Sequence, residues 1–360
     1  MKTLLLIPEL FQSEGGIPRI MRLYLKALCE MDAGDEVRYV ALNDSPGTEP
    51  REEYYTRDRL QSRAGCGRSK LSFIKTSLRL GRGTDRVICG HLHQLSVARL
   101  LQFLHPRLDY YLVAHGIDVW RPYTPLEKHC LRRARRILCI SEYTRRQMLR
   151  FYPALAPARL LVVPNTMDPS FGPSVSAGDR ANLGGLSPRI LVVSRLTAAD
   201  RYKGVDTVIE AMPLVRSEFP RAQLRIVGGG DDRPRLQDLA QAFQVGDAVC
   251  FLGIIDDDAL RAEYAACDVF ALPSRKEGFG LVYLEAMAYG KPCLGARAGG
   301  VPEVIHEGIG ALVEYGNIGQ IAAALSHLLC HPCAPAVVRQ HAETFAFPAF
   351  KRRLANALHS

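Results

Sequence analysis

Two series of short apolar runs divide the chain and limit the folds open to it. The first series lies at Leu4–Ile7, Val37–Leu42, Val87–Cys89, Tyr110–Ala114, Ile137–Ile140 and Leu160–Val163. The second lies at Ile190–Val193, Leu224–Val227, Val249–Leu252, Val269–Leu272 and Cys293–Ala296. Segments with the apolar spacing of helices separate the runs. Strand-like runs that alternate with helices are typical of α/β proteins with parallel sheets.

The break between the two series falls at residues 169–187, which are rich in Pro, Gly, Ser and Ala and predict a linker. A chain of 360 residues is long enough for two domains, each with its own core. We therefore predict two Rossmann-like, doubly wound parallel-sheet domains, residues 1–168 and 169–344. Ligands of such folds bind at the carboxyl ends of the strands, here in a cleft between the domains.

Composition favours a soluble globular protein, because hydrophobic residues make up 48% of the chain and no apolar run approaches the roughly 20 residues of a membrane span. The apolar start at Leu4–Ile7 is interrupted by Pro8 and Glu9, which is too early for a secretory signal. We expect a buried first strand and a cytoplasmic protein. Cys330 and Cys333 have redox-motif spacing but follow a helical stretch and have no second pair, so we expect a structural role.

The net charge of +9 is unevenly distributed. One basic cluster contains Arg132, Arg133, Arg135, Arg136, Arg145, Arg146 and Arg150, and another contains Arg57, Arg59, Arg63, Arg68 and Lys70. Such clusters attract polyanions. The chain shows no helix-turn-helix, zinc-finger or aromatic RNA-binding signature, so we expect no nucleic acid partner. An acidic membrane surface and a simple solvated face remain as alternatives.

Two glutamates in the segment RKEGFGLVYLEAMAYGKP carry the strongest chemical signal. Glu277 lies in a glycine-bearing loop, and Glu285 follows eight positions later, about two turns into an expected helix. A helix start presents unpaired N–H groups and a positive dipole end to anions. Carboxylates beside such a start suit a ligand with hydroxyls and phosphates, such as a sugar nucleotide. The alternative is a solvated loop residue and a surface helix residue.

Arg195 and Lys203 flank the crossing from the strand Ile190–Val193 to the next helix. An arginine fork and a lysine point charge could clamp a diphosphate there, although both could also be plain surface residues. A departing nucleoside diphosphate needs fixed positive groups or a metal ion. Asp256–Asp258 lies in a polar turn and looks like a helix cap. We therefore expect neither a metal ion nor another cofactor.

Several residues of the N-terminal half follow strand ends. Gly15 and Gly16 follow the first strand and let a backbone approach phosphates and acceptor. His115 and Asp118 follow Tyr110–Ala114 and are candidates for sugar binding or acceptor activation. His91 and His93 follow Val87–Cys89 and are candidates for the acceptor side. Each histidine could equally be an ordinary loop residue.

Beyond Glu285 come a helix stop at Tyr289–Pro292, an apolar strand and the glycine turn Gly299–Glu303. This whole stretch resembles the nucleotide-sugar signature of retaining glycosyltransferases with the GT-B fold, family 4. The resemblance covers essentially the whole chain and is densest from Arg195 to Glu307.

The resemblance implies roles for these residues. Arg195 and Lys203 would contact the donor diphosphate, Glu277 the transferred sugar and Glu285 the ribose. The remaining donor contacts would come from the segments around Gly15, Gly16, Gly228, Gly278, Phe279, Gly280 and Leu281. Gly228 would line the wall near the base, and His115 would lie beside the reacting sugar.

The resemblance also implies an activity. The enzyme would move a sugar from a UDP- or GDP-sugar to a glycan or lipid-linked acceptor, with retention and without a metal ion. It could lie at the inner face of the membrane, and its final helix, 345–360, would cross back to the N-terminal domain. A sugar-nucleotide 2-epimerase, a sugar phosphorylase and a non-catalytic nucleotide-sugar-binding protein are the alternatives. The base, the sugar and the acceptor depend on pocket details that motifs do not define.

Overall fold

The computed structural model describes residues 1–13, 15–31, 34–172 and 187–359. The chain divides into two compact units, one of residues 1–168 with 347–360 and one of residues 169–346. Most of the expected linker, residues 173–186, lies outside the described residues. Each unit is a parallel sheet with helices, which confirms the predicted α/β fold of two Rossmann-like domains.

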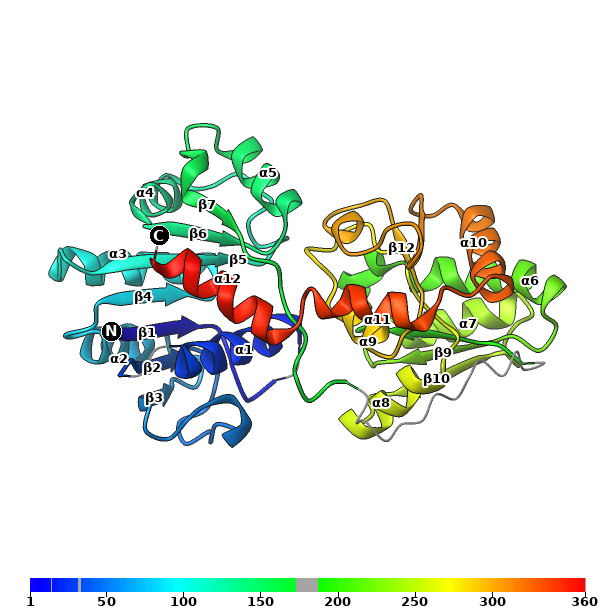
Figure 1. The fold of residues 1–360 in the computed structure, drawn as a ribbon, viewed down its shortest axis with the longest axis horizontal. Coiled ribbons are helices and arrows are strands. Elements are labelled where there is room, and N and C mark those ends of the chain that lie inside the picture. Colours follow the sequence, from blue (N-terminus) through cyan, green and yellow to red (C-terminus); the bar gives the residue numbers. More distant parts are fainter. Residues whose placement is uncertain (14, 32–33, 173–186, 360) are drawn as a thin grey trace. The chain divides into compact units, whose positions relative to one another are not determined.

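The first unit contains a seven-stranded parallel sheet in the order β3-β2-β1-β4-β5-β6-β7 (Figure 1). Its strands are β1 (Lys2–Ile7), β2 (Glu36–Ala41), β3 (Leu60–Gly65), β4 (Arg86–Cys89), β5 (Asp109–Ala114), β6 (Arg136–Cys139) and β7 (Leu160–Val162). The apolar start of the chain forms β1, which pairs with β2 on one side and β4 on the other. Leu4 to Ile7 are fully buried there, as expected for a central strand.

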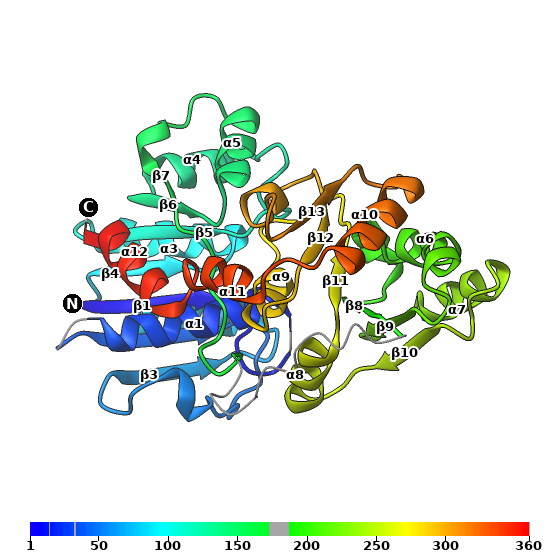
Figure 2. The same ribbon diagram turned by 45° about the vertical axis from the view of Figure 1, so that its right-hand side comes forward.

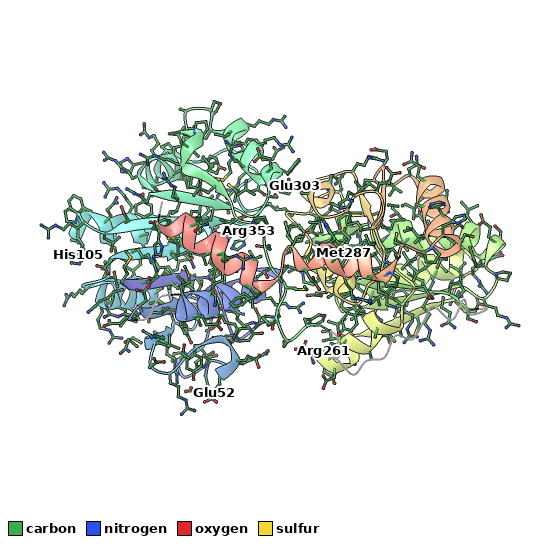
Figure 3. All side chains as sticks on the ribbon, in the orientation of Figure 1. Glu52, His105, Arg261, Met287, Glu303 and Arg353 are labelled. Atoms are coloured by element: carbon green, nitrogen blue, oxygen red, sulfur yellow. The ribbon has the colours of Figure 1, made fainter. Side chains whose placement is uncertain are left out.

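Helices cover both faces of this sheet. They are α1 (Gly16–Glu30), α2 (Lys70–Leu80), α3 (Leu95–Leu104), α4 (Pro125–Arg133), α5 (Glu142–Phe151) and α12 (Phe347–His359), with short 3-10 turns η1 (Glu52–Tyr54), η2 (Leu92–Gln94) and η3 (Pro157–Arg159). The C-terminal helix α12 packs beside α1 (Figures 1 and 3). Phe350 meets Tyr24 edge-on with ring centroids 5.0 Å apart, and Lys351 pairs with Glu30 at 3.1 Å.

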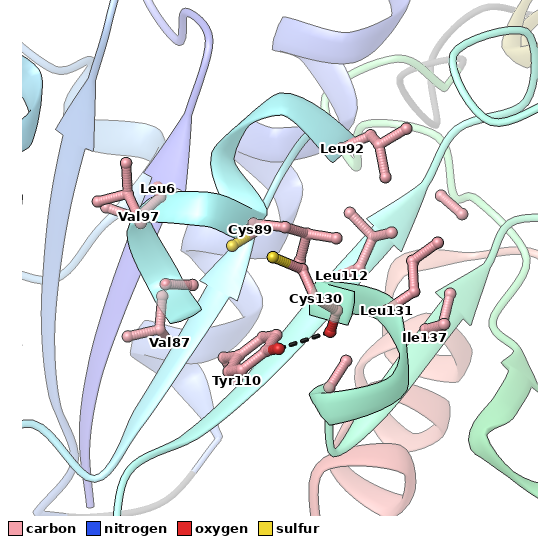
Figure 4. Packing of buried hydrophobic residues seen from close by; sticks show 14 of the residues in the cluster. Leu6, Val87, Cys89, Leu92, Val97, Tyr110, Leu112, Cys130, Leu131 and Ile137 are labelled. Carbon is pink, nitrogen blue, oxygen red and sulfur yellow. Dashed lines mark hydrogen bonds between the residues drawn. The ribbon is translucent and has the colours of Figure 1, made fainter. Parts of the chain in front are cut away.

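One core cluster of the first unit lies between its sheet and helices α2, α3, α4 and α5, and Figure 4 shows part of it. Cys89 and Cys130 are buried within it, where the thiols act as small apolar groups. The hydroxyl of Tyr110 donates to the Cys130 carbonyl at 2.5 Å and fixes α4 to the beginning of β5. All ten cysteines are free thiols.

The second unit contains a six-stranded parallel sheet in the order β10-β9-β8-β11-β12-β13 (Figure 2). Its strands are β8 (Arg189–Val193), β9 (Gln223–Val227), β10 (Val249–Gly253), β11 (Val269–Leu272), β12 (Cys293–Ala296) and β13 (Gly310–Val313). Its helices are α6 (Val205–Glu218), α7 (Arg233–Ala242), α8 (Asp257–Ala266), α9 (Leu281–Ala288), α10 (Ile318–Cys330) and α11 (Pro335–Glu343), with η4 (Ala198–Lys203) and η5 (Val301–Glu303).

The strand order places one switch point in each sheet. The order reverses between β1 and β4 in the first unit and between β8 and β11 in the second. Loops that leave neighbouring strands at such a point run in opposite directions and open a crevice at the carboxyl edge, where ligands bind in open α/β sheets.

Among the described residues, no single helix has the length and apolar character to cross a membrane. One bent pair, Ile318–Cys330 with Pro335–His359, reaches that length and composition.

Candidate functional site

The loop that leaves β8 at the switch point of the second unit carries both predicted cations. It runs from Arg195 through η4 to Lys203 and then enters α6. Buried Asp200 organises this loop, because its Oδ1 lies 3.1 Å from Arg195 Nη2 and accepts the Tyr202 hydroxyl at 3.0 Å. The Arg195 side chain is still 70% exposed. The loop is therefore held in a defined conformation, and it presents a guanidinium that an anion can reach.

Lys203 forms the central contact of the site. Its Nζ lies 2.5 Å from Oε2 of Glu277, which follows β11 on the other side of the switch point. Backbone contacts join the same two loops, since Ser274 Oγ donates to the Lys203 carbonyl at 3.3 Å and Arg275 N to the Tyr202 carbonyl at 2.8 Å. The lysine and glutamate side chains are only 19% and 14% exposed. The structure thus brings one predicted cation and one predicted carboxylate together.

The glycine turn at Gly299 and Gly300 supports Glu277 from behind. The amide of Gly300 donates to the Glu277 carbonyl at 2.8 Å. Gly299 has a φ of +62°, and a Cβ there would lie 2.2 Å from the same carbonyl oxygen. Only glycine fits that position. The GG turn noted in the sequence is therefore part of the scaffold that positions this glutamate.

Helix α9 begins directly after the Glu277 loop. Gly280 takes the cap position at a φ of +93° and has no side chain to satisfy the first N–H groups of the helix. The Phe279 side chain is buried and packs on Phe345, with centroids 5.4 Å apart. Gly278, Phe279, Gly280 and Leu281 therefore offer a ligand chiefly their backbone amides, a form of anion site that a helix start provides.

Glu285 lies closer to the start of α9 than the sequence suggested. The helix begins at Leu281, so Glu285 is little more than one turn into it, and the expected two turns are wrong. The glutamate is 3% exposed, and its Oε2 accepts the Tyr264 hydroxyl at 2.8 Å. Tyr264 belongs to α8, and no sequence signal pointed to it.

The triple glycine after β9 packs against the Arg195 loop. Gly228 has a φ of +132°, and a Cβ on it would lie 1.8 Å from the Ser194 carbonyl oxygen. The Leu196 amide also donates to the Gly229 carbonyl at 2.9 Å. We predicted Gly228 as a wall near the nucleotide base. The contact seen here is with the backbone that carries the predicted diphosphate clamp.

The acidic run at Asp256–Asp258 caps a helix, as predicted. The Asp256 carboxylate accepts from the Ala259 amide at 2.8 Å at the start of α8. In the described part of the chain, no three His, Cys, Asp or Glu side chains gather as a metal-binding group.

The predicted residues of the first unit lie along the carboxyl edge of its sheet. Gly15 and Gly16 begin α1 after β1, and α1 has no side-chain cap. His115 follows β5, and its Nε2 lies 2.9 Å from the Gly90 carbonyl at the end of β4. A carbonyl only accepts, so Nε2 carries the proton and Nδ1 is left as an acceptor. Burial is the main cause that lowers the pKa of His115 to about 4, and the nearby His91 lowers this pKa further in the same direction.

His91 and His93 form a pair beside this residue. Their ring centroids are 4.7 Å apart, and the His93 amide donates to His91 Nδ1 at 3.2 Å. Burial lowers the pKa of His91 to about 4. Asp118 lies in the turn after His115, and burial raises its pKa to about 7. Three imidazoles and one carboxyl group are therefore assembled near the β1–β4 switch point.

Comparisons with known proteins agree with this fold. The model for "Glycosyl transferases group 1" matches residues 182–344, and that for "Glycosyltransferase Family 4" matches residues 14–171. The chain belongs to the group 1, family 4 glycosyltransferases, a class of sugar-transferring enzymes with the GT-B fold.

Relatives of known name share parts or most of the chain. A GDP-mannose-dependent alpha-(1-6)-phosphatidylinositol monomannoside mannosyltransferase of Mycobacterium tuberculosis is 35% identical over 60% of this chain and 59% of its own length. The match therefore spans about three fifths of that relative. The alpha-maltose-1-phosphate synthase of the same organism is 28% identical over 90% of this chain and 88% of its own.

Solved structures share the fold. The Anabaena protein HepE in complex with UDP aligns over 100% of both chains with a TM-score of 0.80 and 19% identity. At that identity the likeness supports the fold alone.

Proposed function

We propose that this protein is a retaining glycosyltransferase that moves a sugar from a nucleoside diphosphate sugar to a glycan or lipid-linked saccharide. The observation that carries the proposal is the contact between Lys203 and Glu277 across the β8–β11 switch point. A cation that can bind phosphate and a carboxylate that can bind sugar hydroxyls lie within hydrogen-bond distance of each other. A sugar joined to a diphosphate needs both kinds of group at that spacing.

The donor would lie along the loops of the second unit. Arg195 and Lys203 bind the diphosphate, and the backbone amides at the start of α9 bind the distal phosphate or the sugar. Glu277 accepts hydrogen bonds from sugar hydroxyls, and Glu285 accepts them from the ribose. The named relative is GDP-mannose-dependent, which supports a nucleoside diphosphate sugar as the donor, and we propose a GDP- or UDP-sugar.

The charged side chains of the site pair with one another. Lys203 neutralises Glu277, and Asp200 partly neutralises Arg195. An arriving diphosphate competes for both cations and releases the Glu277 carboxylate to the sugar. Donor binding therefore replaces internal ion pairs with ligand contacts, so no buried charge is left without a partner.

Transfer breaks the bond between the anomeric carbon and the phosphate oxygen, which leaves with the bonding electrons. The acceptor oxygen bonds to the same face of that carbon, and its proton passes to the departing phosphate. The guanidinium of Arg195 and the ammonium of Lys203 stabilise the negative charge that develops on the leaving group. We propose that these two groups act without a metal ion or another cofactor.

The first unit would hold the acceptor and part of the reacting sugar. Neutral His115 offers Nδ1 to a sugar hydroxyl, and Gly15 and Gly16 allow close backbone approach at the start of α1. Asp118, His91 and His93 would contact the acceptor. A relative that acts on a phosphatidylinositol mannoside supports a lipid-linked acceptor. We propose that the protein works in the cytoplasm at the inner face of a membrane.

Removal of the Lys203 charge tests the proposal. Lys203→Ala should lower the rate of sugar transfer roughly 30- to 1,000-fold, because one charge-assisted contact to the leaving group is lost. Lys75→Ala removes an exposed ammonium from α2 and should leave the rate unchanged. Nucleotide release with a panel of UDP- and GDP-sugars provides the measurement.

Unchanged turnover in Lys203→Ala would refute the diphosphate clamp. Conversion of the donor without any acceptor would identify an epimerase, and donor binding without turnover in wild type would identify a binding protein.

A further inference from the structure

A basic hollow lies on the first unit, apart from the candidate site residues, and it includes part of the first arginine cluster noted in the sequence. It has a volume of about 700 Å³ and is lined by Arg99, Gln102, Phe103, Pro106, Arg132, Arg133 and Arg159. Four of these residues are arginines, and none is acidic. An adjoining hollow of about 260 Å³ shares Arg133 and Arg159 and adds Asp109, Arg135 and Arg136. The two together form a continuous basic surface, which we call the arginine hollow.

The helix that borders the arginine hollow is apolar on two sides. Helix α3 buries Leu95, Val97, Ala98 and Leu101 against the core, as a helix on a sheet should. It also exposes Leu100, Phe103 and Leu104, by 40%, 71% and 52% of their surfaces. These three side chains lie in the last two turns of α3, directly before His105, which is labelled in Figure 3. Exposed apolar side chains beside a cationic hollow need a physical explanation.

Contacts within the fold hold this surface in a defined shape. Arg159 Nη1 donates to the carbonyls of Arg132 and Ala134, at 2.6 and 2.8 Å, and thereby caps the end of α4. The bond from Tyr110 to the Cys130 carbonyl fixes the same turn from below (Figure 4). Arg99 Nε lies 3.2 Å from His129 Nε2 and joins α3 to α4. Arg132 and Arg133 are exposed at the end of this rigid turn.

We infer that the arginine hollow binds the phosphate headgroup of an anionic phospholipid while Phe103 and its apolar neighbours enter the edge of the acyl layer. Arginines match phosphate oxygens with paired N–H groups. Transfer of leucine and phenylalanine side chains from water into hydrocarbon is favourable, whereas contact with a solvated polyanion does not stabilise them. The combination therefore fits a lipid surface better than a nucleic acid.

The position of the hollow separates membrane attachment from catalysis. Asp109 and Arg136 begin β5 and β6, so the hollow lies at the amino edge of the sheet. His115 follows the other end of β5, about 20 Å away at the rise of an extended strand. A lipid held in the hollow is thus an anchor and is too far from His115 to be the reacting acceptor in the same site.

Vesicle co-sedimentation without donor or acceptor tests this inference independently of the proposed activity. Wild type should bind phosphatidylcholine vesicles that contain phosphatidylglycerol and should not bind pure phosphatidylcholine. The double variant Arg132→Gln/Arg133→Gln should bind the anionic vesicles roughly 30-fold more weakly, because each cation near a membrane surface contributes about 1 kcal/mol. The control variant Lys70→Gln/Lys75→Gln removes the same number of positive charges from α2 and should weaken vesicle binding far less.

Two further variants separate the hollow from general charge attraction. Phe103→Ser, on an exposed position, should weaken binding roughly 10-fold without loss of folding. Arg132→Lys/Arg133→Lys keeps the charge but loses the paired N–H groups, and should bind more weakly than wild type.

Transfer to a water-soluble acceptor should be the same in all these variants. Equal binding of neutral and anionic vesicles would overturn the inference. So would an equal loss in the α2 control, or a DNA duplex that binds as tightly as the vesicles and independently of Phe103.

Discussion

At the scale of single residues, the proposed site depends on a contact between two side chains that are far apart in sequence. Glu277 and Lys203 are 74 positions apart, yet their side chains meet at 2.5 Å. Both were predicted as functional residues, Glu277 from its place in the loop after a strand and Lys203 from its place just before a helix. Their mutual contact follows from the order of the strands, which places β8 beside β11. Tyr264 and Asp200, which hold Glu285 and Arg195, were not predicted because a tyrosine or aspartate in a helical segment has no distinctive spacing.

The protonation state of His115 gives a prediction at this scale. A folded-state pKa of about 4 lies below the ordinary value of 6.5, because burial disfavours the charged ring. The ring therefore contributes stability that is present above pH 6.5 and is lost as the pH falls through about 4. NMR titration of the His115 ring should show a midpoint near 4. A midpoint near 6.5 for His115 would mean that its ring is charged at mildly acidic pH and does not act as the proposed acceptor.

At the scale of elements, the sequence predicted the central strands and missed two at the edges. All eleven apolar runs form strands. The missed strands are β3 at Leu60–Gly65 and β13 at Gly310–Val313, each the last strand on one side of its sheet. Strand β3 has the sequence LQSRAG and is largely unburied, so it has no apolar run to detect. Edge strands need less burial than central ones, so hydrophobic patterning identifies them poorly.

Glycines that shape the β8 and β9 loops give a prediction for elements. Gly228→Ala should lower the free energy of unfolding of the second unit by about 2–4 kcal/mol, because a Cβ collides with the Ser194 carbonyl at a positive φ. The shift of the Arg195 loop should also weaken nucleotide binding.

The matched control is Gly319→Ala in α10. Its Cβ would meet nothing closer than 3.7 Å, and alanine should stabilise that helix by about 0.5–1 kcal/mol. Denaturant unfolding of both variants provides the measurement. A Gly228→Ala protein as stable as wild type would show that the loop has another conformation.

At the scale of the whole molecule, the chain forms two units, and its C-terminal helix belongs to the first. We predicted from the family resemblance that this helix, at 345–360, crosses back to the N-terminal domain, since nothing in its own residues identifies its partner. It begins at Phe347, and its buried side chains are Phe347, Phe350, Leu354, Ala357 and Leu358. Tyr111 of β5 donates its hydroxyl to the Leu358 carbonyl at 3.3 Å. The tail is therefore part of the core of the first unit.

Loss of a buried contact in that helix should act on one unit only. Phe350→Ala should cost the first unit about 3–5 kcal/mol, because a fully buried ring that packs on Tyr24 is removed. Binding of the nucleotide, which we assign to the second unit, should persist at temperatures below the unfolding transition. Calorimetric unfolding with and without nucleotide measures both effects. Equal destabilisation of the nucleotide-bound transition would show that the two units unfold together.

Direct binding of the donor tests the central claim, which is that the loops after β8 and β11 hold a nucleoside diphosphate sugar. Isothermal titration with UDP-, GDP- and ADP-sugars should show that donors with one of the three nucleotide bases bind. Glu285→Ala should weaken that binding by about tenfold or more, because the hydrogen bonds to the ribose are lost. The account would be contradicted if none of the three donors gave a heat of binding. It would also be contradicted if the single variants Glu285→Ala and Lys203→Ala both bound the donor with unchanged affinity.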